Sequence, residues 1–145
     1  MSTLSKLEFL DCAMKETVRS YAMLYLTRRV ITPVTIGSHE IPKEEIVAVS
    51  PYYVHHDAAN YADPDTYDPE RFAGSAGLKH VEDKTYIQFG YGPHRCLGEK
   101  FANIVLKTGW LEIFSNYNVD ILTPIPQADL TRYAFAFILQ RIILD

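Results

Sequence analysis

Hydrophobic positions recur at helical spacing near the start of the chain. Between Leu4 and about Tyr21, apolar residues follow one another at intervals of three and four, which predicts a helix with an apolar stripe. The opposite side is not simply polar, because Glu16 lies roughly half a turn from the stripe, beside Phe9 and Cys12. We therefore predict a helix that is buried on two sides. The stripe consists of Leu7, Leu10, Met14, Val18 and Tyr21.

Segments rich in β-branched residues follow this helix and predict short strands. The expected strands are 28–31, 34–36 and 45–50, with Gly37 and Ser38 as the turn between the last two. From 51 to 72 the pattern becomes irregular, since Asp-Pro dipeptides and the triplet HHD are typical of loops and turns.

Polar residues and glycine mark the stretch 74–83, which we interpret as a surface excursion. The histidines outside the glycine-rich loop at 89–98 lack the spacing of metal ligands, and we interpret them as loop and turn residues. These histidines are His39, His55, His56 and His80.

A second helix is expected at 99–115. Its apolar residues lie nearly all round, which is typical of a deeply buried helix. Closing strands are expected at 119–122 and 133–144, with Pro124 and Pro126 between them. Because no linker separates these pieces, we predict that residues 1–145 form one structural unit.

Composition excludes several classes of protein. Hydrophobic residues make up 48% of the 145 residues and charged residues 22%, a globular balance that argues against disorder. The net charge of −4, without a basic run, argues against nucleic acid as a partner. Two cysteines far apart in sequence favour a reducing compartment over a disulfide framework or zinc site. The first residues contain no long apolar run, so neither a signal peptide nor a membrane anchor is predicted.

The stretch FGYGPHRCLG, residues 89–98, places one cysteine in a backbone with three glycines and a proline. Cys96 is expected at the start of the second helix, where free N–H groups and the helix dipole stabilise a thiolate. The glycines allow close backbone approach or positive φ, and Phe89 can shield the sulfur. His94 and Arg95 offer donors to carboxylates. Together these features match the proximal side of a haem; the alternative is an ordinary buried thiol.

Three short motifs lie in order along the chain. The pattern F-x-x-G-x-[HR]-x-C-x-G resembles the haem-binding signature of the cytochrome P450 superfamily. Upstream, Glu16 and Arg19 fit the E-x-x-R helix motif of that superfamily, and the stretch 68–72 resembles its PERF segment. The resemblance implies a mainly helical α+β fold with small sheets, of which residues 1–145 are the C-terminal portion. The signature positions are filled by Phe89, Gly92, His94, Cys96 and Gly98.

The resemblance also implies roles for individual residues. Cys96 is expected to be the axial thiolate ligand of haem iron, which donates electron density and favours O–O cleavage. His94 is expected to bind a haem propionate. Arg28 is expected to bind a propionate too, with Arg29 as its nearest competitor. The alternative for these two arginines is a solvated basic pair.

Glu16 and Arg19 are three residues apart, a spacing at which an exposed pair contributes only a few tenths of a kcal/mol. The helical-wheel argument and the resemblance both favour a buried network with Arg71 instead. Such a network would hold the cysteine loop in register, so these three residues are expected to be structural and not catalytic. Cys12 is expected to be a small core residue.

The reaction that the resemblance implies is insertion of one oxygen atom from O2 into a lipophilic substrate. The electrons would come from NADPH through a reductase or ferredoxin. The triplet His-Arg-Cys in the signature, with Pro126 and 129–131 before the last strands, is similar to sterol 14-demethylases.

One departure from the family pattern concerns the oxygen-activating helix, which should precede Met1. We therefore expect a truncated product or partial sequence whose parent is the enzyme. The parent is expected at the endoplasmic-reticulum membrane, through a missing N-terminal part. The alternative is a non-catalytic haem-binding remnant.

Overall fold

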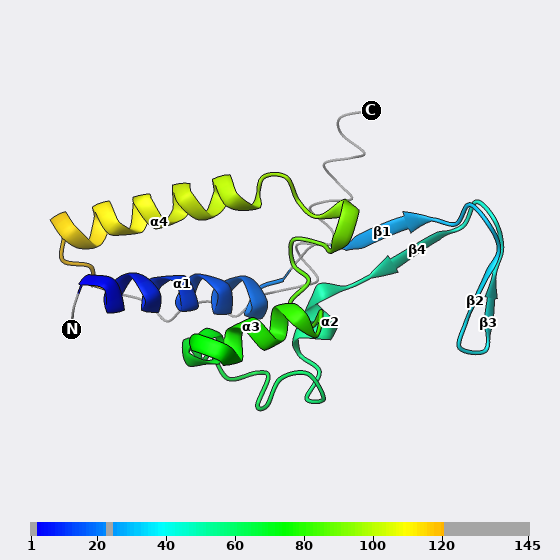
Figure 1. The fold of residues 1–145 in the computed structure, drawn as a ribbon, viewed down its shortest axis with the longest axis horizontal. Coiled ribbons are helices and arrows are strands. Elements are labelled where there is room, and N and C mark those ends of the chain that lie inside the picture. Colours follow the sequence, from blue (N-terminus) through cyan, green and yellow to red (C-terminus); the bar gives the residue numbers. More distant parts are fainter. Residues whose placement is uncertain (1–2, 23–24, 121–145) are drawn as a thin grey trace.

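The computed structural model describes residues 3–22 and 25–120. Two long helices, α1 (Thr3–Ser20) and α4 (Glu99–Asn116), run side by side in opposite directions (Figure 1). Short helices and two-stranded sheets join them, which is the α+β class expected from the sequence. These are β1 (Leu26–Arg29), β2 (Val34–Ile36), β3 (His39–Ile41), β4 (Ile46–Val49), α2 (Pro51–His55), η1 (Pro69–Phe72), α3 (Gly74–Glu82) and η2 (Gly92–His94).

Helix α1 confirms the expected helix and its burial on two sides. The side with Leu10, Met14 and Val18 lines an apolar groove of about 420 Å³ against α4. The opposite side is the more deeply buried one, and it carries polar groups: Glu16 and Arg19 are fully buried. The apolar stripe therefore marks the less buried face of the helix.

The strands form two separate antiparallel pairs. Strand β1 pairs with β4, with Leu26 opposite Val49 and Arg29 opposite Ile46. Strand β2 pairs with β3, a strand that the sequence pattern did not predict because its three residues, HEI, include only one apolar side chain. The turn at Gly37, with φ +60°, therefore joins β2 to β3 and not to 45–50.

The middle of the chain is more helical than its turn-rich sequence predicts. Helix α2 begins with Pro51, which suits a first helical turn, directly after Ser50. The stretch 74–83 lies mostly at the surface, as predicted, but it is not irregular, since α3 occupies it. A β-carbon on Gly77 would clash with the backbone carbonyl of Phe72, so this glycine lets α3 pack directly on η1. Tertiary packing here outweighs the low helix propensity of glycine.

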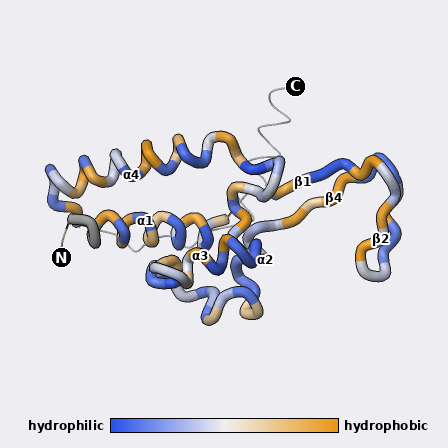
Figure 2. The backbone as a smooth tube through the Cα atoms, viewed as in Figure 1, coloured by the Kyte–Doolittle hydropathy of each residue, from blue (hydrophilic) through white to orange (hydrophobic). Residues whose placement is uncertain are grey.

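Helix α4 lies where it was expected, but the prediction of deep burial was wrong. No residue of α4 is buried: Phe101 is 73% exposed and Ile104 is 65% exposed. Figure 2 shows hydrophobic residues along the whole length of this helix. Within the described part of the chain α1 covers one side of α4, and an all-round apolar helix needs cover on every side.

Two expectations concern the end of the chain. The closing strands at 119–122 and 133–144, with Pro124 and Pro126, lie outside the described residues except for 119 and 120, which form no strand. In the described part of the chain, no helix is both long and apolar enough to cross a membrane.

The core is aromatic and small. Cys12 packs with Tyr61 and Phe72, and Tyr86 packs against this cluster. The buried position of Cys12, 4% exposed, confirms that it is a core residue. The core therefore lies between α1, η1 and the segment that leads to the cysteine loop.

Candidate functional site

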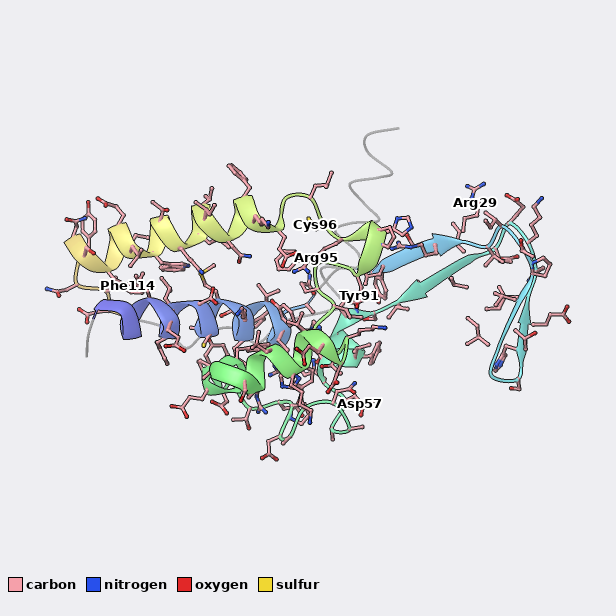
Figure 3. The ribbon with its side chains drawn as sticks, viewed as in Figure 1. Arg29, Asp57, Tyr91, Arg95, Cys96 and Phe114 are labelled. Carbon is pink, nitrogen blue, oxygen red and sulfur yellow. The ribbon has the colours of Figure 1, made fainter. Side chains whose placement is uncertain are left out.

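Cys96 lies in the segment between η2 and α4 (Figure 3), two residues before Gly98, the N-cap of α4. Its side chain is exposed and forms no disulfide. The backbone, in contrast, is held: the Cys96 N–H donates to the Phe89 carbonyl at 2.7 Å, and the Glu99 N–H donates to the Cys96 carbonyl at 3.4 Å. The loop therefore holds the backbone of Cys96 in place and leaves its sulfur accessible.

Glycine conformations shape this loop, although not all as expected. Gly92 has the positive φ that was considered, at +62°, whereas Gly98 has an ordinary φ of −81°. A β-carbon on Gly98 would sit 3.8 Å from the Cys96 sulfur, in ordinary contact. Gly90 fills an unspecified position of the motif, yet its φ is +75° and a β-carbon there would lie 2.9 Å from the His94 carbonyl oxygen. Gly90 is therefore the glycine that the loop requires most.

The two basic residues before Cys96 are arranged differently. Arg95 forms a paired contact with Glu99, at 2.5 Å through Nε and 2.7 Å through a terminal nitrogen, and this carboxylate raises the pKa of Arg95. The donors of Arg95 are thus engaged within the chain. His94, in η2, is exposed.

Arg28 and Arg29 lie on β1 and are both exposed. Arg29 forms an ion pair with Glu44 at 3.3 Å, with both side chains mostly in solvent. Arg28 donates only to the carbonyl of Thr27, its neighbour, at 2.7 Å. Of the two, Arg28 is therefore the one without a carboxylate partner among the described contacts.

Glu16 and Arg19 form a buried, two-pronged ion pair. Arg19 donates to the two carboxylate oxygens of Glu16 at 2.7 and 2.9 Å, and both side chains have no exposed surface. A third Arg19 donor reaches the His55 carbonyl at 2.7 Å. Glu16 also accepts the backbone N–H of Asp68 at 2.9 Å. The pair thus joins α1 to α2 and to the start of η1.

Arg71 completes this group. Its Nε lies 3.5 Å from a Glu16 carboxylate oxygen, so Glu16 lies between the two guanidinium groups. Its terminal nitrogens donate to the carbonyls of Ala62, Asp63 and Thr66, the latter two at 2.7 and 3.2 Å. The structure therefore brings together the three side chains that the sequence predicted to be close.

The interpretation of the remaining histidines as loop and turn residues was wrong for several of them. His39 lies in β3 and His80 in α3, whereas His56 lies in the turn directly after α2, as predicted. His55 is fully buried in α2, and burial lowers its pKa to about 4. Nothing in the HHD triplet distinguishes fully buried His55 from half-buried His56, because only the packing of α2 decides which of the two is enclosed.

The residues around Cys96 fit a haem. Cys96 has a free thiol with an accessible sulfur, which can bind iron. Haem iron needs only one protein ligand on this face. Leu97, fully exposed, and Tyr91, 53% exposed, offer apolar surface beside it, and exposed His94 offers a hydrogen-bond donor for a carboxylate. Across 3–22 and 25–120, no group of three or more histidine, cysteine or acidic side chains could hold a bare metal ion.

Comparisons with known proteins agree with the motifs. A family model described as Cytochrome P450 matches residues 1–142. The chain is 36% identical over 124 residues to a probable cytochrome P450 6d4 of Drosophila melanogaster, covering 83% of this chain and 24% of that protein. It is 35% identical over 133 residues to a sterol 14-demethylase of Arabidopsis thaliana, covering 87% and 27%. It is 33% identical over 119 residues to cytochrome P450 3A27 of Oncorhynchus mykiss, covering 81% and 23%. The chain thus spans about a quarter of the length of these relatives.

Proposed function

The chain belongs to the cytochrome P450 family, and on this premise we propose that Cys96 binds the iron of a haem through its thiolate. The observation that carries the proposal is the accessible sulfur of Cys96 on a loop whose backbone is held by Phe89. When bound, haem supplies the oxygen and electron chemistry of a monooxygenase.

Basic residues are proposed to bind the haem propionates. Exposed His94 is the candidate in the cysteine loop, because Arg95 is already paired with Glu99. Arg28 is the candidate from β1, because Arg29 is paired with Glu44. Both proposals rest on the hydrogen-bond donors of these side chains and on the absence of competing carboxylates in the described contacts.

Glu16, Arg19 and Arg71 are proposed to be structural. Outside this group of three, the side chains bond mainly to backbone groups, which belong to residue 55 and to residues between 62 and 68. They hold the turns between α2 and η1, on which the segment leading to Cys96 packs through Tyr86 and Phe72.

The substrate is proposed to be lipophilic, and the reaction to be insertion of one oxygen atom from O2. The electrons are proposed to come from NADPH through a reductase or ferredoxin. A sterol 14-demethylase-like activity is the finer proposal, supported by the Arabidopsis thaliana relative and by the sequence features noted at 94–96 and 126–131.

A second candidate is a haem-binding module without turnover. It is supported by the exposed apolar faces of α4. We propose that residues 1–145 are the C-terminal portion of a longer domain that covers these faces. Ligand-exchange spectra together with product formation would separate the two candidates.

The test of the ligand assignment is spectroscopic. The purified protein supplied with haem should show the red-shifted Soret band of a ferrous carbonyl complex with a thiolate ligand. Cys96→Ala and Cys96→His should abolish this band, whereas Cys12→Ala, which removes the other thiol, should keep it. An unchanged band in Cys96→Ala would overturn the assignment.

A further inference from the structure

His55 links two parts of the molecule that the family motifs leave unconnected. It is the last residue of α2 and has no exposed surface. Its contacts with Arg19 are reciprocal: Arg19 donates to the His55 carbonyl at 2.7 Å, and the Nδ1 atom of His55 lies 3.3 Å from the Arg19 carbonyl oxygen. The histidine is thus bound to α1 at the buried ion pair.

The other ring nitrogen points toward the cysteine loop. The backbone N–H of Ile87 donates to the His55 Nε2 atom at 3.1 Å. An amide N–H needs an acceptor, so Nε2 carries no proton, and the proton resides on Nδ1, where it is donated to Arg19. Both contacts therefore require the neutral ring in a single tautomer. Packing holds the ring in place, since it stacks on Tyr86 at 5.6 Å and meets the edge of Tyr61 at 6.0 Å.

Ile87 is two hydrogen bonds away from Cys96. The Ile87 carbonyl accepts the N–H of Gly90 at 2.9 Å and so closes the turn around Phe89. The Phe89 carbonyl in turn accepts the N–H of Cys96 at 2.7 Å. An anchor on the Ile87 amide therefore fixes the start of the turn that positions Cys96.

We propose that His55 is a positioning residue for Cys96: its neutral ring joins the Arg19 carbonyl to the Ile87 amide and so sets the cysteine loop against α1. The inference rests on the proposed role of Cys96 as the haem ligand. In this proposal His55 connects the buried ion pair to the cysteine loop. The side chains of Glu16 and Arg71 reach no residue of that loop through any described contact.

The test compares replacements that keep different halves of the link. His55→Phe keeps the aromatic packing and loses both hydrogen bonds. His55→Gln can still accept from the Ile87 amide, whereas the shorter side chain of His55→Asn reaches only the Arg19 side. His56→Gln, at the next position in the chain, is the matched control, because the described contacts of the His56 ring include a hydrogen bond to the Tyr52 carbonyl and none to Arg19 or Ile87.

Two readouts decide the result. In the purified protein, amide hydrogen exchange at Ile87 and Gly90 should be roughly tenfold faster in His55→Phe, the effect of losing one hydrogen bond. In the haem-loaded protein, the fraction of the carbonyl complex with a thiolate ligand should fall. His55→Gln should restore both, and His56→Gln should change neither.

The proposal is overturned if His55→Phe leaves either readout unchanged, or if His55→Asn restores both as well as His55→Gln does. Failure of the ligand assignment gives a different result. In that case the thiolate spectrum is missing in the unaltered protein or persists in Cys96→Ala, while amide exchange still reports whether His55 holds Ile87.

Discussion

Glu16 is the residue whose charge has the most partners in the buried part of the molecule. Its carboxylate faces Arg19 and Arg71 and accepts the N–H of Asp68. Glu16→Gln would leave two guanidinium groups facing each other without a counter-charge. We expect the free energy of unfolding to fall by about 3–5 kcal/mol, the usual cost of breaking a buried pair on one side.

Urea denaturation checks this value. Glu70→Gln is the control, because Glu70 is an exposed carboxylate in η1, beside the same network. It should change the stability by less than about 0.5 kcal/mol. Equal effects of the two replacements would show that Glu16 is not the centre of a buried network.

His55 makes the stability depend on pH. Burial lowers its pKa from 6.5 to about 4 in the folded state, and the positive charge of Arg19, with His56 and His80 nearby, acts in the same direction. Below pH 6.5 the unfolded chain therefore binds a proton that the folded chain does not, and stability falls as the pH falls. We expect a loss of about 2 kcal/mol between pH ~8 and pH ~5.

Chemical denaturation across this pH range measures the loss. His55→Gln does not titrate at this position, so its stability should change less over the same range; His80, whose pKa is also lowered by burial, contributes to the change that remains. Since most unperturbed carboxylates titrate below about pH 5, they contribute little in this window. An identical pH dependence in the two proteins would contradict the assignment of the loss to His55.

Substitution by alanine should have opposite effects on stability at Gly90 and at Gly109. Gly90→Ala would force a β-carbon into a left-handed conformation and against the His94 carbonyl oxygen, so it should cost at least about 1–2 kcal/mol. Gly109 lies in α4 with open space around its β-position, and Gly109→Ala should stabilise by about 0.5–1 kcal/mol. Thermal unfolding of both variants tests this difference, and a stable Gly90→Ala loop would refute it.

At the scale of elements, the interface between α1 and α4 combines an apolar groove with an ion pair between the two helices. Lys107 of α4 contacts Asp11 of α1 at 2.5 Å, and Lys15 contacts the same carboxylate from within α1. Burial alone would raise the pKa of Asp11, but the two lysines outweigh it and lower the pKa. The ion pair between Lys107 and Asp11 therefore helps to fix the position of α4 along α1. The cysteine loop lies directly before α4.

Replacing each lysine in turn distinguishes the ion pair between the helices, made by Lys107, from the pair within α1, made by Lys15. Lys107→Met should lower the free energy of unfolding by about 0.5–1 kcal/mol, because it removes the contact between helices, whereas Lys15→Met should change it less. The difference should shrink in high salt. Denaturation at two salt concentrations measures it, and equal losses would mean that the ion pair between the helices contributes nothing of its own.

At the scale of the whole molecule, the described chain presents much apolar surface on α4. A haem on the Cys96 side would have support from one face, and exposed apolar surface favours aggregation. We therefore expect residues 1–145 alone to bind haem weakly and to hydroxylate no substrate, because oxygen chemistry also needs groups that deliver protons and hold substrate over the iron.

Consumption of reducing equivalents measures this expectation. The same residues joined to the N-terminal part of a complete relative should regain turnover. Coupled, substrate-dependent consumption by residues 1–145 alone would contradict the expectation and would point to a partner that supplies the missing groups.

Local chemistry was sufficient to predict part of this protein. The spacing of apolar residues predicted α1 and α4, since a helical period is a property of neighbouring positions. The order of the motifs around Glu16, Arg71 and Cys96 predicted the family and the proximity of the ion-paired side chains. Each of these features is contained in a short stretch of sequence, so it can be recognised without knowledge of the packing.

Only the tertiary structure decided which surfaces are buried. In the folded chain His55 is fully buried and His56 half-buried, α3 packs on η1 because Gly77 lets it approach, and most of α4 is exposed. The tertiary structure also showed that Gly90 is the most constrained glycine of the loop, whereas Gly98 has an ordinary conformation. Burial and close approach depend on residues far apart in the sequence, and the pattern of one segment carries no record of what packs against it.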